Sequence, residues 1–183
     1  MSQTAPAPLP PGAPGGPAGA QTMPLVVNIQ YVKDMSFEVP GAPQVFTQLR
    51  SQPNVNINLD VQARKLDEGP SNFEVTLVVR AEASLVPGQG GQPAGGSLVT
   101  LFVAELSYAG VFTLNNLPEN AVEPVLLVEC PRILFPFARN ILADVTRDGG
   151  FPPVLLQPID FVALWQSRRQ AAGAAPTPPV GHA

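Results

Sequence analysis

The stretch NIQYVKDMSFEVPGAPQVF (residues 28–46) alternates between apolar and polar side chains until it reaches Pro40. Most odd positions are apolar or aromatic and most even positions are polar: Ile29, Tyr31, Met35, Phe37 and Val39 against Gln30, Asp34, Ser36 and Glu38. Only Val32 and Lys33 interrupt the pattern. A period of two predicts a β-strand with one face on a core. The other face carries two carboxylates, Asp34 and Glu38, and their purpose is the first question that the sequence raises.

Three further stretches have the same period, so the sequence predicts four strands, at 25–38, 54–66, 72–86 and 97–114. In the second strand, asparagines and Asp60 alternate with branched apolar residues. The asparagines and Asp60 superficially resemble the ligands of a calcium loop, but such a loop would need a glycine at its turn. These residues are therefore predicted to form the polar face of a strand. The fourth strand is apolar on both sides over most of its length, which predicts that both of its faces are covered.

A helix is expected after the strands. Apolar residues recur at a spacing of four over about 132–147, and Gly149 stands where a C′ glycine belongs. Pro124, Pro131 and Pro136 are expected to interrupt the apolar run. Pro136 is then either in the first helical turn or at a kink, because proline cannot donate a hydrogen bond inside a helix.

A second helix is expected near the C-terminus. The segment 149–158 contains too much proline for a helix, and Asp160 is a candidate N-cap for the sequence FVALWQSRRQAA that follows it. The Pro/Gly/Ala-rich segments 1–24 and 171–183 are expected to be disordered, because they contain too little apolar bulk to offset the entropy of ordering. Residues 87–96 are expected to form a flexible loop at a hairpin tip.

The composition is unusual for a soluble domain. Charged residues make up 13% of the chain and apolar residues 45%, whereas about 25% charged residues are typical. The chain is therefore expected to expose apolar surface, for an oligomer or for partners. A net charge of −4 argues against nucleic-acid binding. No segment is predicted to insert into a membrane or to act as a secretory signal, and the single cysteine excludes an internal disulfide and fits a reducing cytosol.

The sequence offers little for catalysis. The only histidine, His182, lies in the C-terminal tail, and Cys130 follows an apolar run, where a buried thiol is expected. Neither a metal site nor a cofactor is predicted, because one cysteine and one tail histidine cannot form a zinc site in one chain. The Cα atoms of Asp34 and Glu38 would lie about 13 Å apart on a strand, too far for a pair of glycosidase carboxylates. A binding or scaffolding protein is therefore favoured over an enzyme.

Several blocks, KDMSFE, GAPQVF, CPRILFPFAR and GGFPPVLLQPIDF, occur in an order and spacing that resemble the SecB family of bacterial protein-export chaperones. The resemblance covers about residues 25–166, so a SecB-like domain is expected over 25–170. It implies an α+β fold, a four-stranded antiparallel sheet with two C-terminal helices packed on it. It further implies a cytosolic homotetramer, a dimer of dimers without catalysis, which holds unfolded precursor proteins and delivers them to the translocase ATPase SecA.

The resemblance also implies functional residues. Its acidic positions carry over onto Asp34 and Glu38, which with Val103 and Glu105 are expected to contact SecA. The groove for unfolded clients is expected to lie between the crossover loop after the first strand and the second helix with its preceding loop. These segments contribute Val45, Phe46, Leu49, Phe151, Val154, Leu155, Leu156, Phe161, Leu164 and Trp165. The oligomer interface is expected to use Ala104, Leu106 and Tyr108.

The chain departs from the family pattern at three places. Leu49 and Arg50 stand where the family commonly has a tryptophan, the loop 87–96 is longer than usual, and the C-terminal tail lacks acidic residues. An alternative therefore stays open, a general antiaggregation or antitoxin-linked holdase of the same fold that does not serve SecA. A small-ligand enzyme is the third hypothesis, supported only by a Gly/Pro loop beside a groove.

Overall fold

A computed structural model describes residues 23–48, 53–67, 69, 71–85 and 98–173. Four strands form one antiparallel sheet in the order β1-β4-β3-β2, where the strands are β1 (Leu25–Glu38), β2 (Asn54–Lys65), β3 (Asn72–Leu85) and β4 (Val99–Leu114). The short α1 (Val45–Gln48) follows β1. The predicted α+β fold and all four strands are confirmed.

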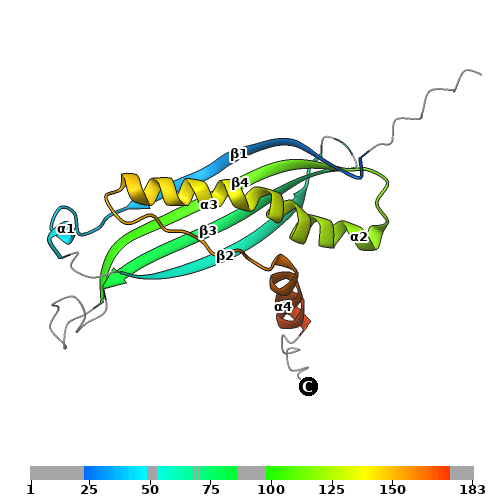
Figure 1. Cartoon of the computed structure of the whole chain (residues 1–183). Helices are drawn as coiled ribbons and strands as arrows, with labels where there is room; N and C mark the ends of the chain where they lie inside the picture. Colours follow the sequence, from blue (N-terminus) through cyan, green and yellow to red (C-terminus); the bar gives the residue numbers. More distant parts are fainter. Residues whose placement is uncertain (1–22, 49–52, 68, 70, 86–97, 174–183) are drawn as a thin grey trace, which may run out of the picture.

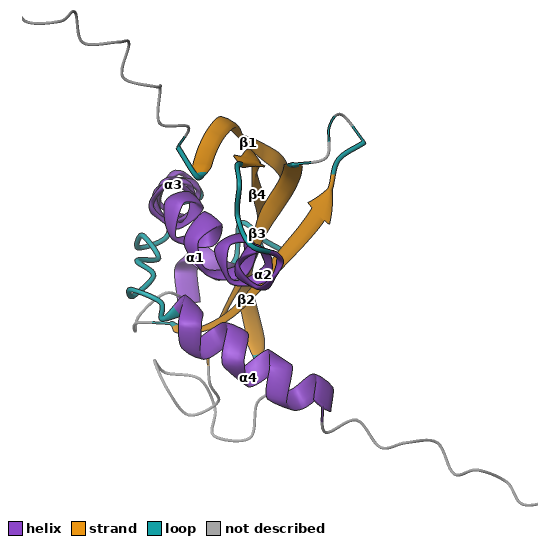
Figure 2. Ribbon diagram, turned by 90° about the vertical axis from the view of Figure 1, so that its right-hand side faces the viewer, coloured by secondary structure: helices purple, strands orange, loops and turns teal. Residues whose placement is uncertain are grey.

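The helical elements that follow the sheet are α2 (Glu119–Pro124), the π-helical turn η1 (Val125–Glu129), α3 (Cys130–Asp148) and α4 (Phe161–Gly173). Helix α3 and η1 pack on one face of the sheet, whereas α2 and α4 pack mainly on η1. Figure 1 shows α3 running along the sheet, and Figure 2 shows α2 and α3 on the same side of it. Within the described residues of this single chain the helices leave the second face of the sheet uncovered, so the expected cover on both faces of the fourth strand stays a prediction. We call this second face the open face.

The core lies between the helices and the sheet. Alternate residues of β3 and β4 point into it and meet α3 and η1, and the most deeply buried side chains are Phe102, Phe112, Phe161, Leu77, Leu101, Leu134 and Leu142. The predicted alternation of these two strands explains this burial, since one residue in two faces the helices.

Strand β1 changes face twice, which the sequence pattern did not fully predict. Its pairing with β4 slips between Val27 and Ile29 and again between Val32 and Asp34. Each β-bulge inserts one extra residue and inverts the alternation that follows. Tyr31 was expected on the core side, but it pairs opposite Ala109 and bonds to Glu74 on the open face. The second bulge restores the predicted arrangement, so Asp34 and Glu38 lie on the open face.

The first long helix begins earlier than predicted. The helical backbone continues from Glu119 to Asp148, and the junction residues Val125 and Cys130 keep right-handed helical dihedral angles. The prolines therefore lie inside the rod instead of interrupting it. Pro131 is the second residue after the π-helical turn, and such a turn removes the need for one regular hydrogen bond.

The end of α3 and the start of α4 lie close to their predicted positions. The segment after α3 has no helix until Asp160, whose Oδ1 accepts hydrogen bonds from the backbone N–H groups of Val162 and Ala163, so the predicted N-cap is confirmed. Gly149 has an ordinary right-handed conformation, and Gly150 is the residue with a positive φ of 87°. Helix α4 extends to Gly173, three residues into the predicted tail 171–183. The described residues do not include the rest of that tail (174–183). They also do not include residues 1–22 of the N-terminal segment or the predicted loop 87–96.

Candidate functional site

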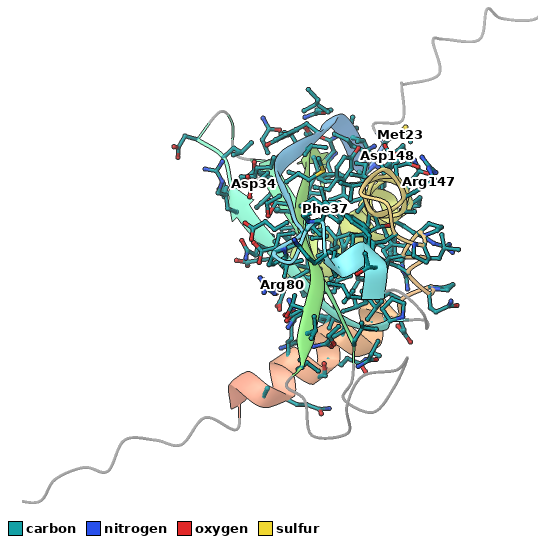
Figure 3. All side chains as sticks on the ribbon, turned by 90° about the vertical axis from the view of Figure 1, so that its left-hand side faces the viewer. Met23, Asp34, Phe37, Arg80, Arg147 and Asp148 are labelled. Carbon is teal, nitrogen blue, oxygen red and sulfur yellow. The ribbon has the colours of Figure 1, made fainter. Side chains whose placement is uncertain are left out.

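The open face brings together the four residues predicted to contact SecA. Glu38 pairs opposite Val103, Ser36 opposite Glu105, and Asp34 is the next paired residue along β1 on this face. Directly opposite side chains in an antiparallel pair lie about 5 Å apart at their Cβ atoms. Figure 3 shows Asp34 on the side of the sheet away from α3. Asp34, Glu38, Val103 and Glu105 therefore form one continuous surface over β1 and β4.

Strand β3 adds two charged residues to this surface that the sequence analysis missed. Glu82 pairs opposite Val103, and Arg80 pairs opposite Glu105. Asp34, Glu38, Glu82 and Glu105 together are called the acidic row below. Arg80 forms ion pairs with Glu105 and, at 3.5 Å, with Glu82. Only the register between β3 and β4 reveals these neighbours, because no spacing along the chain links residues 80–82 to 103–105.

A second cluster on the open face holds Lys33 away from the acidic row. Glu74, 4% exposed, accepts hydrogen bonds from Tyr31, Lys33 and Arg64. These bonds, that from Arg64 first, lower the pKa of Glu74 to about 2, and the bond to Glu74 raises the pKa of Tyr31. Lys33 is the chain neighbour of Asp34 but bonds to Glu74. Within the described residues, Asp34 and Glu38 form neither an ion pair nor a side-chain hydrogen bond.

An apolar groove lies on the helix side of the sheet. Its volume is about 470 Å³, and it runs between β2 and the segment that connects α3 to α4. Its lining consists of Pro53, Val55, Ile57, Phe102, Pro152, Pro153, Val154, Leu155, Leu156, Gln157, Pro158 and Ile159. The connecting segment is held in place by Thr146, which is fully buried and whose Oγ1 accepts a hydrogen bond from the backbone N–H of Val154. The predicted residues Val154, Leu155 and Leu156 thus line one wall.

Aromatic rings connect this groove to the crossover segment after β1. Phe102 in the groove packs on Phe151 with ring centroids 4.9 Å apart, and Phe151 packs on Phe46 at 5.3 Å. Phe46, on α1, is 42% exposed. The crossover segment and the connecting segment thus lie together at Phe46 and Phe151, and the assignment of both residues to a client groove stays a prediction. Leu49 lies outside the described residues.

A smaller cavity of about 220 Å³ contains two of the three predicted residues of α4. Leu164 and Trp165 line it together with Val61, Leu127 and the ends of two arginines. Trp165 donates a hydrogen bond from Nε1 to Glu123, and Arg169 lies over its ring at 5.2 Å. The structure therefore separates the predicted client residues into a main groove and this second cavity.

The remaining predicted residues lie in the core of the single chain. Val45 is 2% exposed, and Phe161 is 1% exposed and packs edge-on against Phe135. The predicted interface residues Ala104, Leu106 and Tyr108 are also buried. Tyr108 stacks on Phe137, whose ring is 49% exposed and extends this cluster to the surface. The assignment of these three residues to an interface stays a prediction.

No catalytic arrangement is found among the described residues. Cys130 is fully buried, and burial raises the pKa of its thiol to about 12, so it is a poor nucleophile. In the same part of the chain, acidic, cysteine and histidine side chains nowhere gather in threes as a metal site would require. None of the helices described is both long and apolar enough to cross a bilayer.

Comparisons with known proteins identify the family of this chain. Residues 18–172 match the family described as preprotein translocase subunit SecB. The protein-export protein SecB of Acidiphilium cryptum is 65% identical over 151 residues, which cover 81% of this chain and 91% of the relative. That of Granulibacter bethesdensis is 66% identical over 146 residues, with 80% and 82% covered.

A solved structure shares the fold at low identity. The SecB-like chaperone of Mycobacterium tuberculosis, in complex with a peptide from the HigA1 antitoxin, has a TM-score of 0.55 and 15% identity over 74% of this chain and 90% of its own. The fold is shared with that structure, and the family match defines the class of protein, a protein-export chaperone. The chain belongs to the SecB family, which confirms the resemblance found in the sequence.

Proposed function

We propose that this chain binds unfolded precursor proteins in the apolar groove and delivers them to SecA through the acidic row, in the cytosol and without a catalytic step. The observation that carries this proposal is the position of the two surfaces on opposite sides of one sheet. The groove is apolar, and the acidic row contains two carboxylates, Asp34 and Glu38, without an ion pair among the described residues. Membership of the SecB family supports both halves.

The groove suits an extended client of variable sequence. A chaperone that accepts many sequences needs apolar contacts and backbone partners instead of paired polar side chains. Val55 and Ile57 line the groove from β2, an edge strand of the sheet. An edge strand offers free backbone donors and acceptors to an extended peptide. Each large apolar client side chain that becomes buried contributes roughly 1.5–3 kcal/mol before ordering costs, so a few anchors give micromolar affinity.

The acidic row suits a basic surface of the partner. Charges at the rim of an interface mainly raise the association rate and set the register, and salt weakens them. Val103 supplies an apolar contact between Glu38 and Glu82, the residues paired with it on either side. The row therefore favours a cationic partner segment that also brings an apolar side chain.

We further propose a homotetrameric assembly, a dimer of dimers. Edge strand β1 exposes apolar side chains that a single chain leaves in water, namely Val27, Ile29, Val32 and Met35, and Phe137 lies exposed on α3. Exposed apolar surface of this kind is typical of a protein that associates. Light scattering is expected to give the mass of about four chains, and a stable monomer would contradict this part of the proposal.

Charge reversal tests the delivery surface. The double variant Asp34→Lys/Glu38→Lys is expected to lose binding to SecA in calorimetric titration but to keep its suppression of client aggregation. The matched control Asp67→Lys/Asp148→Lys reverses two exposed carboxylates away from the row, at the β2–β3 turn and at the end of α3, and is expected to bind SecA normally. If the first variant binds SecA as well as the unmodified chain does, the acidic row is not the delivery surface. If the unmodified chain itself does not bind SecA, the chain is a general holdase of the same fold.

A groove variant tests the client surface independently. Leu155 is 59% exposed in the groove wall, so Leu155→Asp introduces a charge without emptying the core. We expect it to weaken the binding of an unfolded precursor roughly tenfold or more, because a contact worth at least about 1.5 kcal/mol is lost. Met23→Asp changes another exposed apolar residue at the other end of the sheet, where β1 begins and β4 ends, and should bind normally. Equal affinities for the two variants would exclude the groove as the client site.

A further inference from the structure

Arg80 is the one cation that the described residues place within the acidic row. It lies on β3 opposite Glu105, and its guanidinium is forked between two carboxylates: Nη1 faces Glu105 and Nη2 faces Glu82. The other cations that bond on the open face, Lys33 and Arg64, are both bound to Glu74 outside the row. Figure 3 places Arg80 on the same side of the sheet as Asp34.

The two bonds of Arg80 divide the row into an occupied and an open part. Glu105 already has a cation, whereas Asp34 and Glu38 have none among the described residues. A basic partner that docks on β1 and β4 meets Glu105 between Asp34 and Glu38, because Ser36 lies between these two along β1 and pairs with Glu105. The partner therefore competes with Arg80 for one of the central carboxylates of the row.

We propose that Arg80 is an intramolecular competitor that occupies Glu105 in the free chaperone and moves entirely to Glu82 when a cation of the partner binds Glu105. Glu82 thus provides the carboxylate to which Arg80 moves when it leaves Glu105. Arg80 therefore sets how tightly and how selectively the acidic row binds the partner. The inference rests on the proposed function, because it takes the acidic row as the surface that binds SecA.

The energetics permit such an exchange. The side chains of Arg80 and Glu105 are 47% and 46% exposed, and that of Glu82 is 38% exposed. Ion pairs between exposed groups contribute little, because water and salt screen them. Guanidinium geometry also allows Arg80 to bind one carboxylate with both nitrogens. Moving from two carboxylates to one is therefore inexpensive, and a weakly basic ligand would not displace Arg80 as readily as a well-placed cationic segment.

The first test removes the competitor. Arg80→Gln is expected to tighten SecA binding two- to fivefold, which corresponds to the range of exposed ion pairs, and to make the affinity more sensitive to salt, because the row gains net charge. Arg80→Lys keeps the charge and is expected to stay within twofold of the unmodified chain. Arg132→Gln is the matched control, since Arg132 forms a similar exposed ion pair with Glu129 on α3. It should leave the affinity unchanged.

A double-mutant cycle tests the role of Glu82. Glu82→Gln alone is expected to weaken SecA binding, because Arg80 then has only Glu105. In the Arg80→Gln background the same substitution should have a clearly smaller effect, since Glu82 then has no arginine to accept. Interaction of this kind appears as non-additivity of the two single effects. Equal effects of Glu82→Gln in both backgrounds would overturn the exchange.

The outcomes separate this inference from the proposed function. If Asp34→Lys/Glu38→Lys abolishes SecA binding and Arg80→Gln leaves it unchanged or weaker, the exchange is wrong and the delivery surface stands. An equal gain in Arg132→Gln would likewise overturn it, because net charge alone would explain the result. If the double reversal has no effect on SecA binding, both fall. Arg80→Met repeats the test with a second neutral side chain where Arg80→Gln alters the melting temperature.

Discussion

The substitution Glu74→Gln tests the cluster that separates Lys33 from the acidic row. Glu74 is 4% exposed and accepts hydrogen bonds from Tyr31, Lys33 and Arg64, which come from β1 and β2 on either side of β3 and β4. Glutamine keeps the size of the side chain but removes its charge. The variant therefore leaves two cations and a phenol without their shared anion.

The magnitude follows from the lowered pKa of Glu74. Each pKa unit is worth about 1.4 kcal/mol, so a fall from 4.5 to about 2 corresponds to about 3–4 kcal/mol at most. The side chains of Lys33 and Arg64 are 43% and 66% exposed, so solvent screening reduces the contribution to about 1–2 kcal/mol. The free energy of unfolding of Glu74→Gln at pH 7 is expected to be lower by this amount.

The pH dependence has a definite sign. Because the pKa of Glu74 is lower in the folded chain than in the unfolded chain, its contribution is complete above about pH 4.5 and is lost as the pH falls towards about 2. Urea titrations of both proteins at pH 7, 5, 4 and 3, at one protein concentration, measure the difference. The difference should shrink below pH 4.5. Glu105→Gln, an exposed carboxylate on the same face, is the control and should cost less than about 1 kcal/mol. A difference for Glu74→Gln that stays constant down to pH 3 would refute this explanation.

Three further substitutions test how the groove and its helices are held. Asp160→Ala removes the N-cap that receives two backbone N–H groups, so we expect a loss of about 1 kcal/mol and faster amide hydrogen exchange confined to α4. Thr146→Val removes the acceptor for the N–H of Val154, and we expect a cost of about 1–3 kcal/mol in urea unfolding with weaker client binding. Gly149→Ala places a Cβ 2.2 Å from Cε1 of Phe37. Overpacking of this kind costs about 1–3 kcal/mol of stability, so the melting temperature should fall. The prediction for Asp160→Ala is contradicted by unchanged hydrogen exchange in α4, and that for Thr146→Val by unchanged client binding. The prediction for Gly149→Ala is contradicted by an unchanged melting temperature.

Local patterns predicted the strands well because the period of two depends on neighbours along the chain. The interruption of that period at Val32 and Lys33 coincides with a β-bulge in the structure. The other bulge lies between Val27 and Ile29, after the run Leu25–Val27, which is apolar at every position and so does not distinguish the two faces; the side occupied by Tyr31 could therefore not be predicted. The period of the sequence alone does not tell which face of the sheet a residue occupies, because the pairing with the neighbouring strand decides where a β-bulge inserts an extra residue.

The predicted start of the long helix was wrong for a different reason. Proline is locally unfavourable in a helix, and this preference placed the start near Arg132. The structure continues the helix back to Glu119, because η1 accommodates Pro131 and the rod gains by packing Leu126 and Val128 into the core. Tertiary burial outweighed local preference here, and no local signal reports it.

The candidate site was predictable only where it follows the chain or the family. Asp34 and Glu38 share a strand face by spacing, and the resemblance added Val103 and Glu105. Glu82 and Arg80 depend on strand register, which the sequence does not give. Val55 and Ile57 were not among the predicted groove residues, because nothing along the chain indicates that the connecting segment leaves a groove above β2.

The two proposed surfaces share strand β4 yet do not compete for space. Phe102 lines the groove on the helix side, and Val103, the next residue, belongs to the surface on the open face. Successive residues of a strand point to opposite faces, so a client bound over Phe102 leaves Val103 and Glu105 uncovered. A single chain can therefore hold a client and meet its partner at the same time, which a chaperone needs if the client is to be passed on without first being released into water.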